Sequence, residues 1–397
     1  MRVATVTISD GQRRVRLARR HALAAPYRVG DQVAAARSVV ALHATEAASV
    51  HLAVAARTEG VAVADIDRTL YEERSLVKQL AMRRTLFAFP RDLLPSALAS
   101  ASERVATALS ARIIKAVVEN GVAADGQAWL DEACRAVERA VRDASALSNA
   151  EIRGAVEMVR GQVQVGSGKW GQAVPVSPWV CSMLTLRGRL TRGAPVGAWT
   201  NPRPRWCLME DWLSGPVEPV DTAEAYTELV RRWLERFGPG TVDDIVWWLG
   251  ATKGIVRAAL TQVHAVEVGL EDGQVGWVLP GDETDEPEVE PWAALLPVLD
   301  PTTMGWKGRG IYLDPDDRPY LFDSNGNAGT TAWWNGRIVG CWVQDATGTV
   351  RVVARHELGA AADSALAAEA ERLTTWLGGT VVTNLYASAQ QRGLRLS

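Results

Sequence analysis

Two polar side chains, His43 and Thr45, flank one alanine inside the otherwise apolar stretch at residues 39–46. Residues two apart share a face only in extended backbone, because on a continuous helix they diverge by about 200°. A cooperating pair therefore requires the chain to leave the helix here, and Thr45 suits the N-cap of a following helix. A neutral histidine can accept a proton from water, and a threonine hydroxyl can orient that water. The alternative is a capping threonine beside a histidine at the edge of the core.

Other reactive patterns are missing from the sequence. It contains no C-x-x-C, no H-E-x-x-H and no G-x-S-x-G, and its five histidines are scattered. We therefore expect no metal site and no cofactor. The G-S-G-K run at residues 166–169 lacks the spacing of a phosphate-binding loop. It is better interpreted as the tip of a β-hairpin, from which Lys169 and backbone amides could still touch a phosphate.

Length and composition favour an ordinary globular protein. The 397 residues, 47% hydrophobic and 22% charged, correspond to two to four folding units. Four cysteines are too few for a disulfide scaffold. We find no apolar run long enough to cross a membrane and no signal peptide, so the expected location is cytoplasmic, with reduced thiols.

Charge is distributed unevenly along the chain. Residues 1–120 carry 18 basic and 11 acidic side chains, whereas residues 271–317 are strongly acidic and the net charge is only −3. A basic N-terminal portion on an acidic protein is typical of a nucleic-acid-facing surface. A solvated face would give the same pattern.

The clearest structural unit lies at residues 221–280. Apolar residues four apart predict a helix over 222–237, and Thr241 and Thr252 are suitable N-caps for two further helices. Asp272-Gly273 joins two strand-like runs, 265–270 and 275–279, as in a β-hairpin. Three short helices followed by a hairpin are typical of a winged helix.

A second copy of this pattern and a third, weaker copy precede it. We expect helices at 127–144, 149–159 and 177–186 in one copy, and at 32–42, 49–58 and 65–73, followed by strands within 76–89, in the other. From residue 291, frequent turn signals predict a small β domain that ends in a helix at 363–377, with 281–290 as a linker. The predicted fold class is α+β: winged-helix domains at 1–120, 121–220 and 221–290, and a C-terminal β-barrel-like domain at 291–397.

Five stretches carry a family resemblance in the same order along the chain. They are LHATE at 42–46, LAMRRTLF at 80–87, FGP at 237–239 with DIVWW at 244–248, LDPTTMGWK at 299–307 and FDSNGNAG at 322–329. With them the sequence resembles the AlkZ/YcaQ-type DNA glycosylases and, more closely, related actinobacterial winged-helix DNA-binding proteins. The stretches span nearly the whole chain.

The resemblance implies tandem winged helices around a basic, concave DNA channel. It also implies excision of bulky or cross-linking alkylpurine adducts. The family's catalytic signature, Gln-x-Gln or Gln-x-Asp in a sister branch, falls on His43 and Thr45, so the sequence departs from it at both positions. We expect these two residues to be catalytic and six others to contact DNA: Arg83, Arg84, Arg153, Lys169, Trp306 and Lys307.

The favoured hypothesis is a monomeric, monofunctional glycosylase that acts on duplex DNA carrying N7-alkylguanine-type adducts. It would serve DNA repair or self-resistance to a genotoxic natural product. The alternative is a non-catalytic winged-helix DNA-binding protein or regulator, whose recognition helix would be 253–263. A small-molecule scaffold, based only on the sixteen tryptophans, is a third interpretation.

Overall fold

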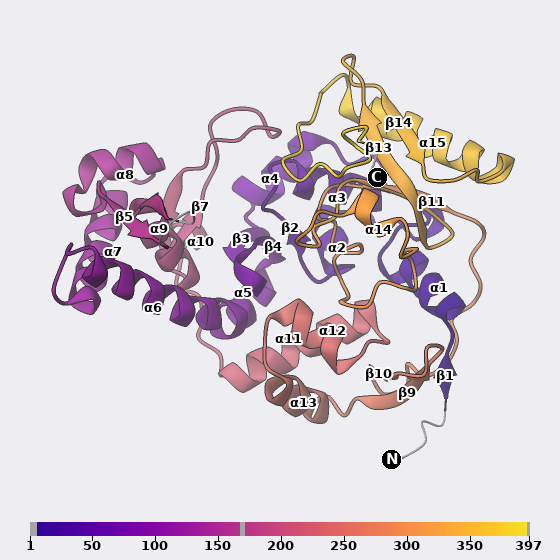
Figure 1. Cartoon of the computed structure of the whole chain (residues 1–397), viewed down its shortest axis with the longest axis horizontal. Helices are drawn as coiled ribbons and strands as arrows, with labels where there is room; N and C mark the ends of the chain where they lie inside the picture. The colour runs from indigo at the N-terminus through magenta and orange to yellow at the C-terminus, as the bar shows by residue number, and fades with distance from the viewer. Residues whose placement is uncertain (1–5, 167–170, 395–397) are drawn as a thin grey trace.

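The chain folds into two lobes, each with its own hydrophobic core (Figure 1). The computed structural model describes residues 6–166 and 171–394. The larger core draws buried side chains from Leu17 to Ala101 and again from Tyr226 to Cys341. The core of the second lobe lies between Ala106 and Leu208. The second lobe is therefore inserted between two parts of the chain that pack against each other.

The N-terminal part of the larger lobe combines helices with a small antiparallel sheet in the order β2-β4-β3. Its elements are α1 (Asp10–Arg20), η1 (Ala25–Tyr27), α2 (Gln32–Arg37), β2 (Leu42–His43), α3 (Ser49–Arg57), α4 (Val63–Tyr71), β3 (Leu76–Leu80), η2 (Met82–Arg84), β4 (Leu86–Pro90), η3 (Arg91–Leu93) and α5 (Leu94–Ala97). The helix expected over 32–42 ends at Arg37. It is shorter because Leu42 and His43 pair instead with Ala88 and Phe87 of β4.

The second lobe packs three long helices around a shared apolar centre. After a π-helical turn, η4 (Leu98–Ser102), it contains α6 (Glu103–Glu119), α7 (Gly126–Ala144), α8 (Asn149–Ala155), η5 (Glu157–Val159), β5 (Gln162–Val165), β6 (Gln172–Pro175), α9 (Ser177–Leu186), β7 (Leu190–Arg192), β8 (Trp206–Leu208) and α10 (Met209–Leu213). Ser148 and Glu151 form a capping box at the start of α8. The three helices that the sequence predicts in this lobe are present as α7, α8 and α9, and α8 ends four residues earlier than predicted.

The expected three helices and hairpin are also present at residues 222–278. They are α11 (Thr222–Phe237), α12 (Val242–Leu249), α13 (Lys253–Gln262), β9 (Val266–Leu270) and β10 (Val275–Val278). Thr241 and Thr252 cap their helices as predicted. A strand that no sequence pattern indicated, β1 (Thr7–Ile8), pairs in parallel with β9. The tandem winged-helix arrangement itself remains a prediction.

The C-terminal part is built on an open four-stranded sheet, which corrects the β-barrel-like expectation. The sheet order is β11 (Ala293–Leu296), β12 (Thr331–Trp334), β13 (Arg337–Gln344) and β14 (Val350–Ala354), and among the described residues β11 and β14 do not pair with each other. A short α14 (Arg318–Leu321) precedes β12. The sheet stays open because α15 (Ala360–Leu377) covers its apolar side chains, with Leu366 and Leu373 packed near Trp342.

Two polar contacts bind distant parts of the larger lobe together. Arg57, at the end of α3, donates two hydrogen bonds to Asp300, at 2.7 and 2.8 Å, and both side chains are fully buried. Arg20 of α1 pairs with Asp282 and Glu286. The acidic segment expected to be a linker therefore packs on the first helix and neutralises part of the basic N-terminal charge.

Candidate active site

The backbone around His43 leaves the helical conformation, as predicted, and joins the small sheet. Ala44 N–H donates to Leu86 O at 2.8 Å, and Leu86 N–H donates to the Thr45 hydroxyl at 3.2 Å. The expectation that Thr45 caps the next helix is wrong. Helix α3 begins at Ser49, and the Thr45 hydroxyl is already bound to β4.

His43 lies in the protein interior, directly behind Thr45. Its side chain is 3% exposed, and its ring centroid lies 4.9 Å from that of Phe87. Its Nδ1 accepts a hydrogen bond from the Thr45 amide at 3.4 Å. Burial, assisted by the nearby positive charge of Arg83, lowers the pKa of His43 to about 3. The ring is therefore neutral at physiological pH.

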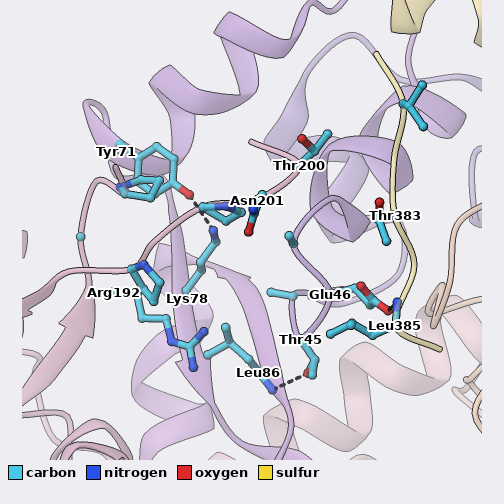
Figure 2. A pocket seen from close by; sticks show the side chains of 17 residues that line it. Thr45, Glu46, Tyr71, Lys78, Leu86, Arg192, Thr200, Asn201, Thr383 and Leu385 are labelled. Atoms are coloured by element: carbon cyan, nitrogen blue, oxygen red, sulfur yellow. Dashed lines mark hydrogen bonds between the residues drawn. The ribbon is translucent and has the colours of Figure 1, made fainter. Parts of the chain in front are cut away.

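Thr45, in contrast, is exposed and lines a cavity of about 430 Å³ (Figure 2). Three separate parts of the chain form the cavity: residues 44–86, the segment that follows β7, and a C-terminal segment that follows α15. In Figure 2, Thr45 and Glu46 lie on one side with Thr383 and Leu385, and Tyr71, Lys78 and Arg192 lie on the other. The cavity thus lies where both lobes and the C-terminal segment meet. His43 does not line it.

Glu46 fixes the C-terminal segment at the cavity wall. One of its carboxylate oxygens accepts the amides of Leu385 and Tyr386 at 2.6 and 2.9 Å. Desolvation raises the pKa of Glu46, although the two amide hydrogen bonds act in the opposite direction. A carboxylate held at this place puts negative charge beside any group that enters the cavity.

The opposite wall contains residues that the sequence analysis missed. Lys78 of β3 donates a hydrogen bond from Nζ to the Tyr71 hydroxyl at 2.7 Å, and Arg192 ends β7 beside them. Lys78 could have been noticed, because it is one of only five lysines and lies in an apolar strand. Arg192 could not, because it lies more than a hundred residues away in the sequence.

The two arginines expected to contact DNA have different environments. Arg83 and Arg84 both have left-handed backbone, with φ of 52° and 62°, in the turn between β3 and β4. The Arg83 guanidinium lies over the Trp247 ring at 3.8 Å, and burial lowers its pKa to about 10. Arg84 is exposed. Arg84 lies two residues before Leu86, whose amide binds the Thr45 hydroxyl.

The other predicted contacts are dispersed. Arg153 is half-buried on α8 in the second lobe, and Lys307 is exposed, with its Nζ 3.7 Å from Asp243. Trp306 is 2% exposed and packs against His21, Phe237 and Trp233. Its indole is inside the larger core, so it does not line a channel. Lys169 lies outside the described residues.

Two further structural findings bear on the chemistry. Among the helices at 6–166 and 171–394, none combines the length and apolar character needed to cross a bilayer. In the same part of the chain, no three His, Cys, Asp or Glu side chains come together as a metal-binding group would require. The polar groups that line the cavity include the Thr45 hydroxyl, the Glu46 carboxylate and the cations of Lys78 and Arg192.

Comparison with known proteins identifies the family. Curated proteins give no match. The solved structure of Streptomyces sahachiroi DNA glycosylase AlkZ is similar in fold, with a TM-score of 0.68 and 18% sequence identity over 92% of this chain and 96% of that one. The sequence model described as DNA glycosylase AlkZ-like matches residues 36–376. Since that match covers most of the chain, including the cavity wall at Thr45 and Glu46, the protein belongs to the AlkZ-like DNA glycosylase family.

Proposed function

We propose that this DNA glycosylase hydrolyses the N-glycosidic bond of bulky or cross-linked alkylpurines of the N7-alkylguanine type. It acts as a monomer on duplex DNA, in repair or in self-resistance to a genotoxic natural product. The observation that carries the proposal is the cavity of about 430 Å³, which Glu46 and Thr45, the latter at a position of the family's catalytic signature, line. Its walls contain both a carboxylate and cations, which suits a charged sugar–phosphate substrate.

The chemistry required at this cavity is modest. A purine alkylated at N7 is already cationic and leaves readily, so the enzyme must place a water and stabilise an oxocarbenium-like sugar. The Thr45 oxygen accepts the Leu86 amide, which leaves its own proton free to bind that water. The Glu46 carboxylate supplies negative charge beside the cationic sugar.

His43 completes the proposed pair from behind Thr45. Its ring is neutral, as a hydrogen-bond acceptor must be, and its Nδ1 accepts a hydrogen bond from the Thr45 amide. Because Nδ1 accepts the hydrogen bond of the Thr45 amide, the neutral ring carries its proton on Nε2, so acting as a base requires that a water reach the ring and displace this bond. Acting as a positioning residue requires only the contact with Thr45. Substitution by glutamine, the family's residue, separates these roles because it keeps a hydrogen-bonding group and removes the base.

The test is base release from duplex DNA carrying an N7-alkylguanine adduct, measured in single-turnover reactions. We expect Thr45→Ala and His43→Ala to slow release at least about tenfold, the size of one lost catalytic hydrogen bond, with DNA affinity unchanged. If His43→Gln retains activity, His43 acts as a positioning residue. If His43→Gln loses activity, His43 acts as the base. Thr107→Ala, at an exposed threonine on α6, is the matched control.

One result contradicts the proposal. If the wild-type protein binds duplex DNA but releases no base from small or bulky alkylguanine adducts, it does not have the substrate class proposed here. The non-catalytic DNA-binding role weighed in the sequence analysis would then account for the fold.

A further inference from the structure

The cationic wall of the cavity has no function in the hydrolysis described so far. Lys78 comes from β3 of the larger lobe and Arg192 from β7 of the second lobe, so two lobes contribute one charge each. The Tyr71 hydroxyl, at the end of α4, accepts a hydrogen bond from Lys78. In Figure 2 the Lys78 ammonium points to Tyr71 and the Arg192 guanidinium lies nearer Leu86, all three being on the side of the cavity opposite Thr45 and Glu46.

In the described part of the chain, no carboxylate pairs directly with the positive charges on this wall, although Asp67 is near enough to act on Lys78 and the Arg192 guanidinium lies 5.4 Å from the centre of the Trp206 ring. Within the described residues, neither Lys78 nor Arg192 forms an ion pair with a carboxylate, and Arg192 Nε is buried without a hydrogen-bond partner. The nearby acids are engaged elsewhere, Asp67 with His51 at 3.0 Å and Glu46 with two backbone amides. Burial lowers the pKa of Lys78 to about 8 and also lowers that of Arg192.

Two desolvated cations without counter-ions are costly unless an anion joins them. The Lys78 ammonium donates one of its three N–H groups to Tyr71, so two N–H groups are free to bind a ligand. The Tyr71 hydroxyl accepts that hydrogen bond, so its own proton is free to be donated. Together with the guanidinium of Arg192, these donors suit the several acceptor oxygens of a phosphate group. The opposite wall is where the proposed hydrolysis takes place.

We propose that Lys78, Arg192 and Tyr71 form a subsite for one phosphodiester of the damaged strand, next to the sugar that faces Thr45. This inference rests on the proposed function, because it takes DNA as the occupant of the cavity. Since the two cations come from different lobes, the bound phosphate also bridges the lobes across the cavity. Lys78 and Arg192 are thus positioning residues that hold the sugar against Thr45.

The test measures DNA binding without base release. The probe is a fluorescein-labelled duplex containing a tetrahydrofuran abasic analogue, titrated by anisotropy at several NaCl concentrations. Lys78→Gln and Arg192→Gln should each weaken binding about tenfold and reduce the slope of log Kd against log salt by about one. Lys78→Arg should restore most of the affinity and slope. Lys115→Gln, at an exposed lysine paired with Glu119, should leave both unchanged.

The outcomes separate the possible anions. If Lys78→Gln and Arg192→Gln are folded, as judged by Tm, but bind with wild-type affinity and slope, the subsite is disproved. If inorganic phosphate raises the Tm of the wild type and not of Lys78→Gln while DNA binding is unaffected, the site holds a free anion and the DNA assignment is overturned. If the slope falls but no adduct is ever released, the subsite stands and the proposed substrate class fails. Using both variants keeps the test valid if one does not fold.

Discussion

His43 illustrates how burial alters a residue whose type alone indicates a base. Its pKa is lowered to about 3, so between pH 3 and pH 6.5 the unfolded chain binds a proton that the folded chain does not. Stability therefore falls as the pH drops below about 6.5. From pH 7.5 to pH 5, this residue should remove about 2 kcal/mol of unfolding free energy, since each pKa unit corresponds to about 1.4 kcal/mol.

We therefore expect His43→Gln to be less sensitive to acid than the wild type. The difference in unfolding free energy between pH 7.5 and pH 5 should be about 2 kcal/mol smaller, measured by urea denaturation. Thr107→Ala, at an exposed threonine on α6, is the control and should behave as the wild type does. An equal pH dependence in wild type and His43→Gln would show that the ring takes up protons in the folded state.

At the same scale, the sequence could predict a break at His43 but not the partners of Thr45. The break follows from the spacing of two polar residues, which is local information. The Thr45 hydroxyl binds Leu86, 41 residues away, and the cap expected from its residue type was wrong for that reason. Thr241 was predicted correctly because its partner, Asp244, lies within the same helical turn.

At the scale of elements, Asp244 connects α12 to the turn that follows Trp306. Its carboxylate accepts a hydrogen bond from the Thr241 hydroxyl at the start of the helix. It also accepts hydrogen bonds from the amides of Lys307 and Gly308, both at 2.9 Å. Asp244→Ala should lower stability by about 2 kcal/mol, because it removes one half of a capping box and the acceptor of two part-buried amides. Thermal and urea unfolding would measure this loss.

Asp243→Ala is the matched control for Asp244→Ala. Asp243 lies in the same turn of α12 but is on the surface, beside Lys253 and Lys307. Its replacement should have a much smaller effect, since exposed ion pairs contribute little. Equal losses from the two substitutions would mean that the turn at 307–308 does not depend on Asp244.

Glu46 has an equivalent role for the C-terminal segment that closes the cavity. Glu46→Ala should release the amides of Leu385 and Tyr386, because it removes their shared acceptor. Hydrogen exchange at these two amides should accelerate by at least about tenfold, as expected for the loss of charge-assisted bonds. Glu46→Gln keeps an acceptor oxygen and should retain most of the protection. Unchanged exchange in Glu46→Ala would contradict this anchoring role.

At the scale of the whole molecule, the Arg57–Asp300 pair joins the N-terminal helices to the segment that follows β11. Because both partners are fully buried, removing one leaves an uncompensated charge. Arg57→Met should cost about 3–5 kcal/mol in urea unfolding, and adding Asp300→Leu should recover much of it. Arg37→Met, at an exposed pair with Asp92, should cost about 1 kcal/mol or less. A double variant as unstable as Arg57→Met would show that charge is not the cause.

This buried pair also marks a limit of sequence-based prediction. The LDPTTMGWK stretch was recognised as family-like, yet its Asp300 and Trp306 prove to be packed inside the larger core. Helices, caps and hairpins with local signals were mostly found. The β1–β9 pair, the Arg57–Asp300 pair and the cationic wall depend on residues more than a hundred positions apart, so no local pattern could reveal them.

The nested arrangement of the two cores determines the order in which the protein can fold during its synthesis. A ribosome has delivered every core residue of the second lobe once Leu208 has emerged, whereas the larger core must wait for Cys341. The lobe that comes second in the sequence is therefore the first that can fold. Until Cys341 has emerged, the larger core, to which Val39, Val40, Ala41 and Leu42 contribute, remains incomplete.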